Sequence, residues 1–159
     1  MILVTGASGQ LGYDVVKELE HRKIPCLGIP RADLELENIS AIREYFKIHS
    51  AKAVIHCAAY TLVDKAEEER ESCYNSNVIV TENIAKVCNE LDISMLYLST
   101  DYVFPGEGTK EYETNDKKDP LNFYGETKLD GEYKVIDNLQ KYFIVRISWV
   151  FGANGNNFV

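Results

Sequence analysis

A tyrosine and a lysine, Tyr124 and Lys128, stand four residues apart in a stretch with helical periodicity. Because positions i and i+4 share one face of a helix, their phenol and ammonium groups should project together. A phenol ordinarily titrates at about pH 10, and a nearby cation lowers that pKa. The pair therefore predicts proton transfer, with Tyr124 protonating a carbonyl oxygen as hydride reaches the carbon. Lys128 would also hold the ribose hydroxyls of a bound cofactor.

A threonine, Thr100, closes an apolar run that should form the fourth strand. Ligands bind at the carboxyl edge of a parallel sheet, so its hydroxyl would align a substrate carbonyl with Tyr124. Serine and threonine also simply end strands and begin turns. Matches to Tyr-x-x-x-Lys arise often by chance, so the catalytic interpretation depends on Thr100 and on a cofactor-binding motif upstream.

Such a motif follows the first apolar run, where Thr5–Gly12 has glycines spaced G-x-x-G-x-x-G. One glycine would make a tight turn, one would admit a diphosphate, and one would let the helix pack on the strand. The diphosphate would sit at the helix N-terminus, held by free amides and the helix dipole. The alternative is an ordinary strand-to-helix turn. The residues predicted to contact a dinucleotide here are Gly6, Gly9, Gln10, Leu11 and Gly12.

The end of the second strand bears on which dinucleotide is bound. An acidic residue there would bond the ribose 2′-hydroxyl and repel a 2′-phosphate. The strand instead ends at Arg31, whose planar guanidinium would pair with a 2′-phosphate. This favours NADPH modestly over NADH and leaves both open. Asp33 and Leu34 would lie against the adenine.

The elements that must position these residues follow an alternating pattern of strands and helices. This order predicts an α/β fold, a doubly wound parallel sheet of the Rossmann type, as one dinucleotide-binding domain over residues 1–159. The short apolar runs read as strands buried on both faces; they are Ile2–Thr5, Pro25–Ile29, Ala53–His56, Met95–Ser99 and Phe143–Ser148. The predicted helices are Gln10–His21, Ile39–Ser50, Glu67–Leu91 and Tyr124–Leu139, with a loop over Pro105–Asn122.

Composition narrows the class of protein. The formal net charge of −8 argues against nucleic acid or an anionic membrane as the main partner. No apolar run is long enough to span a bilayer, and the N-terminus has no signal-peptide pattern, so we expect a cytoplasmic protein. Four scattered cysteines without a C-x-x-C pair predict buried free thiols rather than a zinc or redox site.

Several blocks together resemble the extended short-chain dehydrogenase/reductase superfamily and, within it, the dTDP-4-dehydrorhamnose reductases. STDYVF and SWVFG are more specific than the glycine turn or Tyr-x-x-x-Lys. The matching blocks are Thr5–Gly12, Cys57–Glu67, Ser99–Pro105, Pro120–Lys128, Arg146–Gly152 and Gly155–Phe158.

The resemblance implies NAD(P)H-dependent reduction of the 4-keto group of a dTDP-linked deoxysugar, giving dTDP-L-rhamnose. It implies Thr100, Tyr124 and Lys128 as the catalytic triad and a nucleotide-sugar as the substrate. Asp101 and Trp149 would lie near the sugar, although a lone tryptophan is as often a core residue. The residues implied to line the path to the nicotinamide are Ala58, Ala59 and Tyr60.

Length is the main departure from the family, whose members continue for roughly another hundred residues. Those residues build a smaller substrate domain, which is largely absent here. The contacts of a homodimer, and any metal ion at its interface, would lie there too. We expect cofactor binding by this chain and regard its turnover as doubtful.

Two other functions fit the same scaffold. A sugar-nucleotide epimerase or dehydratase would keep an oxidised cofactor, but the Asp-Glu pair of a dehydratase is missing because Tyr102 follows Asp101. A non-catalytic regulatory subunit would bind the cofactor and a partner enzyme, and the intact triad argues against it.

Two further features predict structural roles. His56, after the third strand, should be a hydrogen-bonded structural histidine rather than a residue of the cleft. An acidic cluster should be a solvated face that complements a helix dipole rather than a metal site; it comprises Glu67, Glu68, Glu69 and Glu71.

Overall fold

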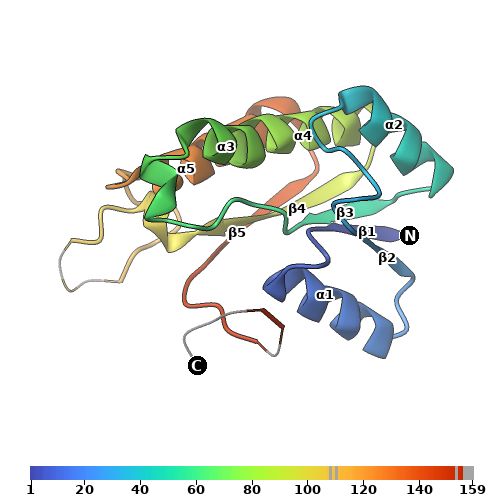
Figure 1. The fold of residues 1–159 in the computed structure, drawn as a ribbon, viewed down its shortest axis with the longest axis horizontal. Helices are drawn as coiled ribbons and strands as arrows, with labels where there is room; N and C mark the ends of the chain where they lie inside the picture. Colours follow the sequence, from blue (N-terminus) through green and yellow to red (C-terminus); the bar gives the residue numbers. More distant parts are fainter. Residues whose placement is uncertain (108, 110, 153, 156–159) are drawn as a thin grey trace.

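A five-stranded parallel sheet forms the centre of the molecule (Figure 1). The computed structural model describes residues 1–107, 109, 111–152 and 154–155. The strand order is β2-β1-β3-β4-β5, so the chain reverses direction across the sheet between β1 and β3. This confirms the predicted Rossmann-type sheet, with strand ends within one residue of those predicted. The strands are β1 (Ile2–Thr5), β2 (Cys26–Ile29), β3 (Ala53–His56), β4 (Ser94–Thr100) and β5 (Tyr142–Ile147).

Helices cover the two faces of the sheet unequally. Figure 1 shows α2, α3, α4 and α5 on one face and α1 on the other, beside β1 and β2. In the described residues no helix is long and apolar enough to cross a membrane. The α-helices are α1 (Gln10–His21), α2 (Ile39–Ile48), α3 (Arg70–Tyr74), α4 (Val80–Glu90) and α5 (Phe123–Asn138).

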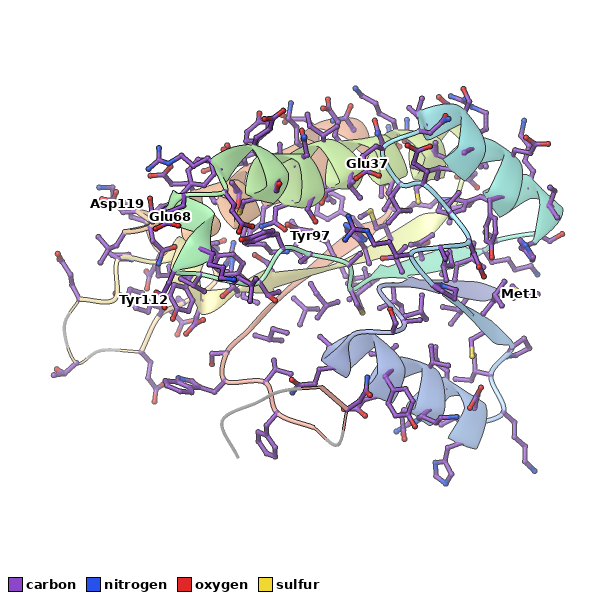
Figure 2. The ribbon with its side chains drawn as sticks, in the orientation of Figure 1. Met1, Glu37, Glu68, Tyr97, Tyr112 and Asp119 are labelled. Atoms are coloured by element: carbon purple, nitrogen blue, oxygen red, sulfur yellow. The ribbon has the colours of Figure 1, made fainter. Side chains whose placement is uncertain are left out.

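The core lies between the sheet and its four-helix layer. Leu3, Val54 and Met95 point from three neighbouring strands into this layer and are fully or almost fully buried. Figure 2 shows the ring of Tyr97 in the same layer, where it is completely buried. The apolar strands thus bury one face here, as their composition predicts.

The prediction that every strand is buried on both faces is wrong for β5. Phe143 is 69% exposed and Val145 is 38% exposed, although their neighbours Tyr142 and Ile144 pack against the core. Side chains alternate between the two faces of a strand. The face that Phe143 and Val145 share is the α1 side, and α1 contacts β1 and β2 instead.

The single helix predicted over residues 67–91 is divided. A 3₁₀ turn, η1 (Lys65–Glu67), precedes α3, and a π-helical turn, η2 (Asn75–Ile79), joins α3 to α4. The π turn adds a residue to the helical repeat and turns Asn77 inward, where it is 1% exposed. Its carboxamide accepts a hydrogen bond from Tyr60 N (2.8 Å) and donates to Tyr60 O (3.2 Å). Tertiary contacts therefore stabilise a turn that apolar periodicity does not reveal.

Candidate active site

One large cavity opens at the carboxyl ends of the strands, with a volume of about 1000 Å³. All five strands send residues to its wall, which is where ligands bind in open α/β sheets. The lining includes Gly6 after β1, Arg31 after β2, Ala58 after β3, Thr100 at the end of β4 and Trp149 after β5. Residues predicted from separate parts of the sequence therefore meet at one site.

The glycine turn has the geometry of a phosphate-binding loop. Gly6 has a φ of +67°, and a Cβ there would stand 2.6 Å from Ala58 N. A Cβ on Gly12 would stand 2.2 Å from Gly6 O, so the close packing of α1 on the turn requires glycine. Gly9 caps α1 without any side-chain hydrogen bond, which leaves the first amides of the helix available to an anion.

Gln10 gives the turn a polar group that lacks a partner. Its Nε2 atom is buried and has no hydrogen bond within the described part of the chain. Buried amide groups are usually bonded, so this one is suited to an acceptor on a bound molecule. Gly152 lies against Asp14 and Gln10 of α1, and Asn154 Nδ2 donates to Ser8 O (3.3 Å) and Gly9 O (3.4 Å) of the turn. The matching block Gly155–Phe158 falls mostly outside the described residues.

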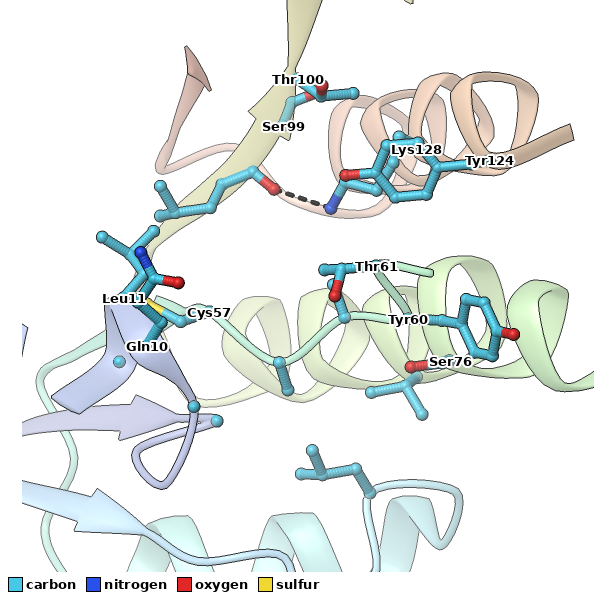
Figure 3. Close-up of a pocket in the computed structure, with 18 of the residues that line it drawn as sticks. Gln10, Leu11, Cys57, Tyr60, Thr61, Ser76, Ser99, Thr100, Tyr124 and Lys128 are labelled. Atoms are coloured by element: carbon cyan, nitrogen blue, oxygen red, sulfur yellow. Dashed lines mark hydrogen bonds between the residues drawn. The ribbon is translucent and has the colours of Figure 1, made fainter. Parts of the chain in front are cut away.

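Helix α5 begins beside the end of β4 and carries the tyrosine and lysine. Asn122 caps it, with Oδ1 accepting from Gly125 N at 2.7 Å. A Cβ on Gly125 would stand 2.4 Å from Tyr102 O, so glycine lets the helix approach the segment after β4 closely. Figure 3 shows the side chains of Tyr124 and Lys128 projecting from the same face of α5 toward β4. The predicted i, i+4 arrangement is present.

Lys128 is buried and forms a hydrogen bond with the sheet. Its Nζ donates to Leu98 O at 2.7 Å and lies 4.2 Å from the centroid of the Tyr97 ring. Burial lowers the pKa of this ammonium to about 7, and the negative charge of Glu132 opposes that shift. Lys128 is thus a buried amine whose charge changes near neutral pH.

The pKa of Tyr124 moves opposite to the expectation from a neighbouring cation. Burial raises it to about 12, and the neighbouring Thr100 hydroxyl partly offsets the effect of burial. Lys128 directs its ammonium to Leu98 O, and its own charge is weakened by burial. The phenol therefore remains protonated at neutral pH, as a proton donor must.

Thr100 lies where the sequence predicts, at the carboxyl edge and 6% exposed. Its hydroxyl donates to Asp101 Oδ1 (3.1 Å) and accepts from Tyr102 N (3.2 Å). The Tyr102 ring meets the Tyr124 ring edge-on, with centroids 5.7 Å apart. These contacts hold the threonine beside the phenol.

The other predicted binding residues take different places. Ala58, Ala59, Tyr60 and Asp101 line the cavity, as do Leu34 and the exposed Arg31. Trp149 also lines it and is 77% exposed, so it is not part of the core of the described residues. Asp33 is exposed and is absent from the lining. Its predicted adenine contact therefore has no support from the shape of this cavity.

His56 is a structural residue, as predicted. The Thr81 hydroxyl donates to Asn77 O (2.8 Å), so it accepts from His56 Nε2, 3.2 Å away. His56 Nδ1 then accepts from the Thr5 hydroxyl at 2.7 Å. Burial and the charge of Lys128 lower the histidine pKa to about 3, so it stays neutral. This chain of hydrogen bonds joins the strand before the glycine turn to η2.

Asn77 and Glu69 contribute to the site although the sequence did not single out their roles. Asn77 Nδ2 donates to Thr127 Oγ1 (3.0 Å), which in turn donates to Tyr124 O (2.8 Å), so η2 supports α5. Glu69 accepts from the Tyr60 hydroxyl at 2.7 Å. Side chains at π turns often serve functional sites, so knowledge of this turn would have pointed to Asn77. The apolar periodicity of the sequence does not reveal the turn.

The acidic cluster is more than a solvated face. Glu67 accepts from Phe123 N (2.8 Å) and pairs with Arg70 (2.8 Å), so it helps begin α5. Glu69, which accepts from the Tyr60 hydroxyl, lines the cavity, so two of the four carboxylates have structural partners near the site. No group of three metal-ligating side chains occurs in the residues that the structure describes. Of the four free cysteines, Cys73 and Cys88 are buried as predicted, whereas Cys26 and Cys57 are only partly buried.

Several known proteins that are similar to this chain are named dTDP-4-dehydrorhamnose reductase. A dTDP-4-dehydrorhamnose reductase of Streptomyces griseus is 38% identical over 158 residues, which cover 99% of this chain and 52% of that protein. A dTDP-4-dehydrorhamnose reductase of Bacillus anthracis, solved in complex with NADP, has a TM-score of 0.95 and 39% identity. One from Clostridium acetobutylicum has a TM-score of 0.94 and 39% identity. Both structural matches cover 99% of this chain and 56% of the other.

The chain therefore spans about half the length of the curated relatives that it matches. A family model described as the RmlD substrate binding domain matches residues 1–159, which is every residue of the sequence. Fold, site geometry and relatives agree, and the chain belongs to the RmlD substrate binding domain family.

Proposed function

We propose that this chain binds NADPH or NADH and carries the catalytic residues for reduction of a dTDP-linked 4-keto deoxysugar. The observation that carries the proposal is one cavity that joins the glycine turn to Thr100, Tyr124 and Lys128. The relatives named dTDP-4-dehydrorhamnose reductase support the choice of substrate. The product would be dTDP-L-rhamnose.

The residues at the glycine turn suit a dinucleotide. Gly6 and Gly12 leave no room for a side chain, and the buried Gln10 amide lacks a partner. The diphosphate would rest on the free amides of α1. Arg31, exposed at the edge of the cavity, would pair with a 2′-phosphate, which favours NADPH modestly. When bound, the reduced nicotinamide supplies the hydride.

Residues of this chain would then orient the substrate and protonate its oxygen. Tyr124, with a pKa of about 12, keeps its proton until a negative charge develops on the substrate oxygen. The O–H bond of Tyr124 breaks as the new O–H bond of the sugar alcohol forms. Thr100 orients the carbonyl, and Lys128 binds the ribose and stabilises the phenolate that remains.

The competing functions fit less well. Tyr102 occupies the position after Asp101 where a dehydratase would have glutamate, and its ring packs on Tyr124. A regulatory subunit would not need Thr100 held beside a buried, protonated phenol. We infer a cytoplasmic reductase with no nucleic-acid partner, and a homodimer in the complete protein.

The test has two stages. The chain is first titrated with NADPH and with NADH by calorimetry; no binding of either would refute the cofactor assignment. The complete protein is then mixed with dTDP-4-dehydrorhamnose, and nicotinamide absorbance is followed. Oxidation of neither cofactor by the complete protein would refute the reductase assignment.

The matched variants are Tyr124→Phe and Tyr133→Phe, both on α5. Tyr133 is 48% exposed and remote in role, so its loss should change nothing. Tyr124→Phe should lower turnover by about 100- to 10,000-fold while leaving NADPH affinity nearly intact, as loss of a general acid does. Equal turnover in the two variants would refute the role of Tyr124.

A further inference from the structure

A buried ion pair lies one helical turn beyond Lys128. Glu132 is 1% exposed, and both of its carboxylate oxygens contact Arg146 of β5. Arg146 Nε donates to Oε1 at 2.8 Å and Nη2 donates to Oε2 at 2.7 Å. The Ser99 hydroxyl adds a third hydrogen bond to Oε1 at 2.5 Å. Three donors from two strands therefore fix one carboxylate on α5.

These bonds place α5 against β4 residue by residue. Three consecutive residues at the end of β4 each contact one residue of α5. The three α5 residues are spaced one helical turn apart. Lys128 binds Leu98 O, Glu132 binds the Ser99 hydroxyl, and Tyr124 meets the Thr100 side chain. Because Ser99 is paired with Arg146 in the sheet register, the ion pair also joins β5 to this contact. A slip of the helix would break all three contacts together.

The same pair sets the charge around Lys128. Glu132 is the strongest of the groups that favour the charged ammonium, followed by the thiols of Cys57 and Cys73. Burial raises the pKa of both thiols, so at neutral pH they carry no charge. The other titratable groups facing Lys128 are His56, Tyr97 and Tyr124, and each stays neutral because burial shifts its pKa. Glu132 is thus the one full negative charge among these groups, and Arg146 shares it.

Arg146 extends the connection to the loop over residues 105–122. Its Nη1 donates to Thr114 O at 3.0 Å, and its guanidinium lies 5.1 Å from the Phe104 ring centroid. Phe104 stacks on Tyr112 with centroids 4.6 Å apart. One arginine therefore contacts the helix, the sheet and the loop beside the carboxyl edge.

We propose that Glu132 and Arg146 are positioning residues that set both the placement of α5 and the charge of Lys128. Glu132 favours the protonated form of the buried amine, and Arg146 limits that effect by sharing the carboxylate. The inference rests on the proposed function for its catalytic meaning, since Lys128 would use this charge to bind the cofactor ribose.

The experiment titrates Lys128 directly in the full chain without nucleotide. Lysine labelled with ¹³C at Cε is followed by NMR against pH, and the Lys128 signal is identified by its loss in Lys128→Met. Glu132→Gln should lower the Lys128 pKa by on the order of one pH unit, the usual effect of removing an adjacent opposite charge. Arg146→Gln should raise it, and Arg146→Lys, which keeps the charge, should leave it closer to the parent value.

Shifts in opposite directions separate a charge effect from mere loosening of the fold. The matched controls are Glu90→Gln and Arg43→Gln, which break a bidentate surface pair with bonds of 2.7 and 3.0 Å. Neither control should move the Lys128 signal. No shift in Glu132→Gln, or shifts of the same sign in Glu132→Gln and Arg146→Gln, would overturn the proposal.

Glu132→Gln leaves Arg146 without its partner and is the variant most prone to unfold. Arg146→Met and the double variant Glu132→Gln/Arg146→Met differ only at Glu132, so their comparison measures the same effect. The double variant should have the lower Lys128 pKa by on the order of one pH unit, and equal values would contradict the proposal.

A parallel titration with NADPH separates the two proposals. Absence of NADPH binding by the parent chain, with the predicted NMR shifts present, would refute the proposed function and leave the charge assignment standing. Normal NADPH binding without those shifts would refute only the charge assignment.

Discussion

Replacing Lys128 with methionine should make the chain more stable, and the gain should depend on pH. Burial lowers the Lys128 pKa from its ordinary 10.5 to about 7. That difference corresponds to about 5 kcal/mol, at about 1.4 kcal/mol per pH unit. The lost hydrogen bond from the charged ammonium to Leu98 O offsets about 2 kcal/mol of it. We expect a net gain of about 3 kcal/mol in the free energy of unfolding at pH 6–7.

The pH dependence follows from where the proton binds. Below about pH 7 both the folded and the unfolded chain hold the Lys128 proton, so the cost of the buried charge is constant. Between about pH 7 and 10.5 the unfolded chain binds more protons, so the parent protein gains stability as pH rises. The advantage of Lys128→Met should therefore shrink by about 1.4 kcal/mol per pH unit across that window.

Urea denaturation of the two proteins at pH 6 to 9.5, followed by circular dichroism, measures this difference. Taking the difference cancels the titration of the tyrosines and thiols that both proteins share. The control is Lys134→Met, on the same helix with a side chain 35% exposed, which should give no comparable gain. A difference that stays flat with pH, or a Lys128→Met protein that is less stable throughout, would refute the buried, charge-strained lysine.

Three further predictions concern the cavity wall. Gly12→Ala would place a Cβ 2.2 Å from Gly6 O, and should weaken NADPH binding at least tenfold by calorimetry; unchanged affinity would show that the turn holds no diphosphate. Arg31→Glu should shift preference from NADPH toward NADH, since a carboxylate repels a 2′-phosphate; an unaltered affinity ratio would remove Arg31 from the site. Asn77→Leu breaks the bonds to Tyr60 and Thr127, and should lower the free energy of unfolding by about 2–4 kcal/mol, which a lower urea midpoint would report. A midpoint unchanged within error would argue against its support of α5.

The amino-acid sequence by itself determined the order of elements and the residues at their ends. Short β-branched runs and amphipathic stretches are local patterns, so the sequence alone predicted the parallel sheet. The predicted bounds of α1, α5 and the strands lie close to the observed ones. The glycine turn was likewise readable, because the space that Gly6 and Gly12 leave is a backbone requirement. The i, i+4 spacing of Tyr124 and Lys128 put both on one face of α5.

Only the tertiary structure decided how these residues are charged and what holds them. The sequence suggested that Lys128 lowers the Tyr124 pKa, but burial under neighbouring elements raises that pKa and lowers the lysine's. Burial depends on segments far apart in the chain, and no local pattern reports it. The ion pair between Glu132 and Arg146, and the π turn that directs Asn77 to Tyr60, arise in the same way. Spacing thus placed the phenol and the ammonium on one helix, and the packing of β4, β5 and η2 against that helix set their protonation.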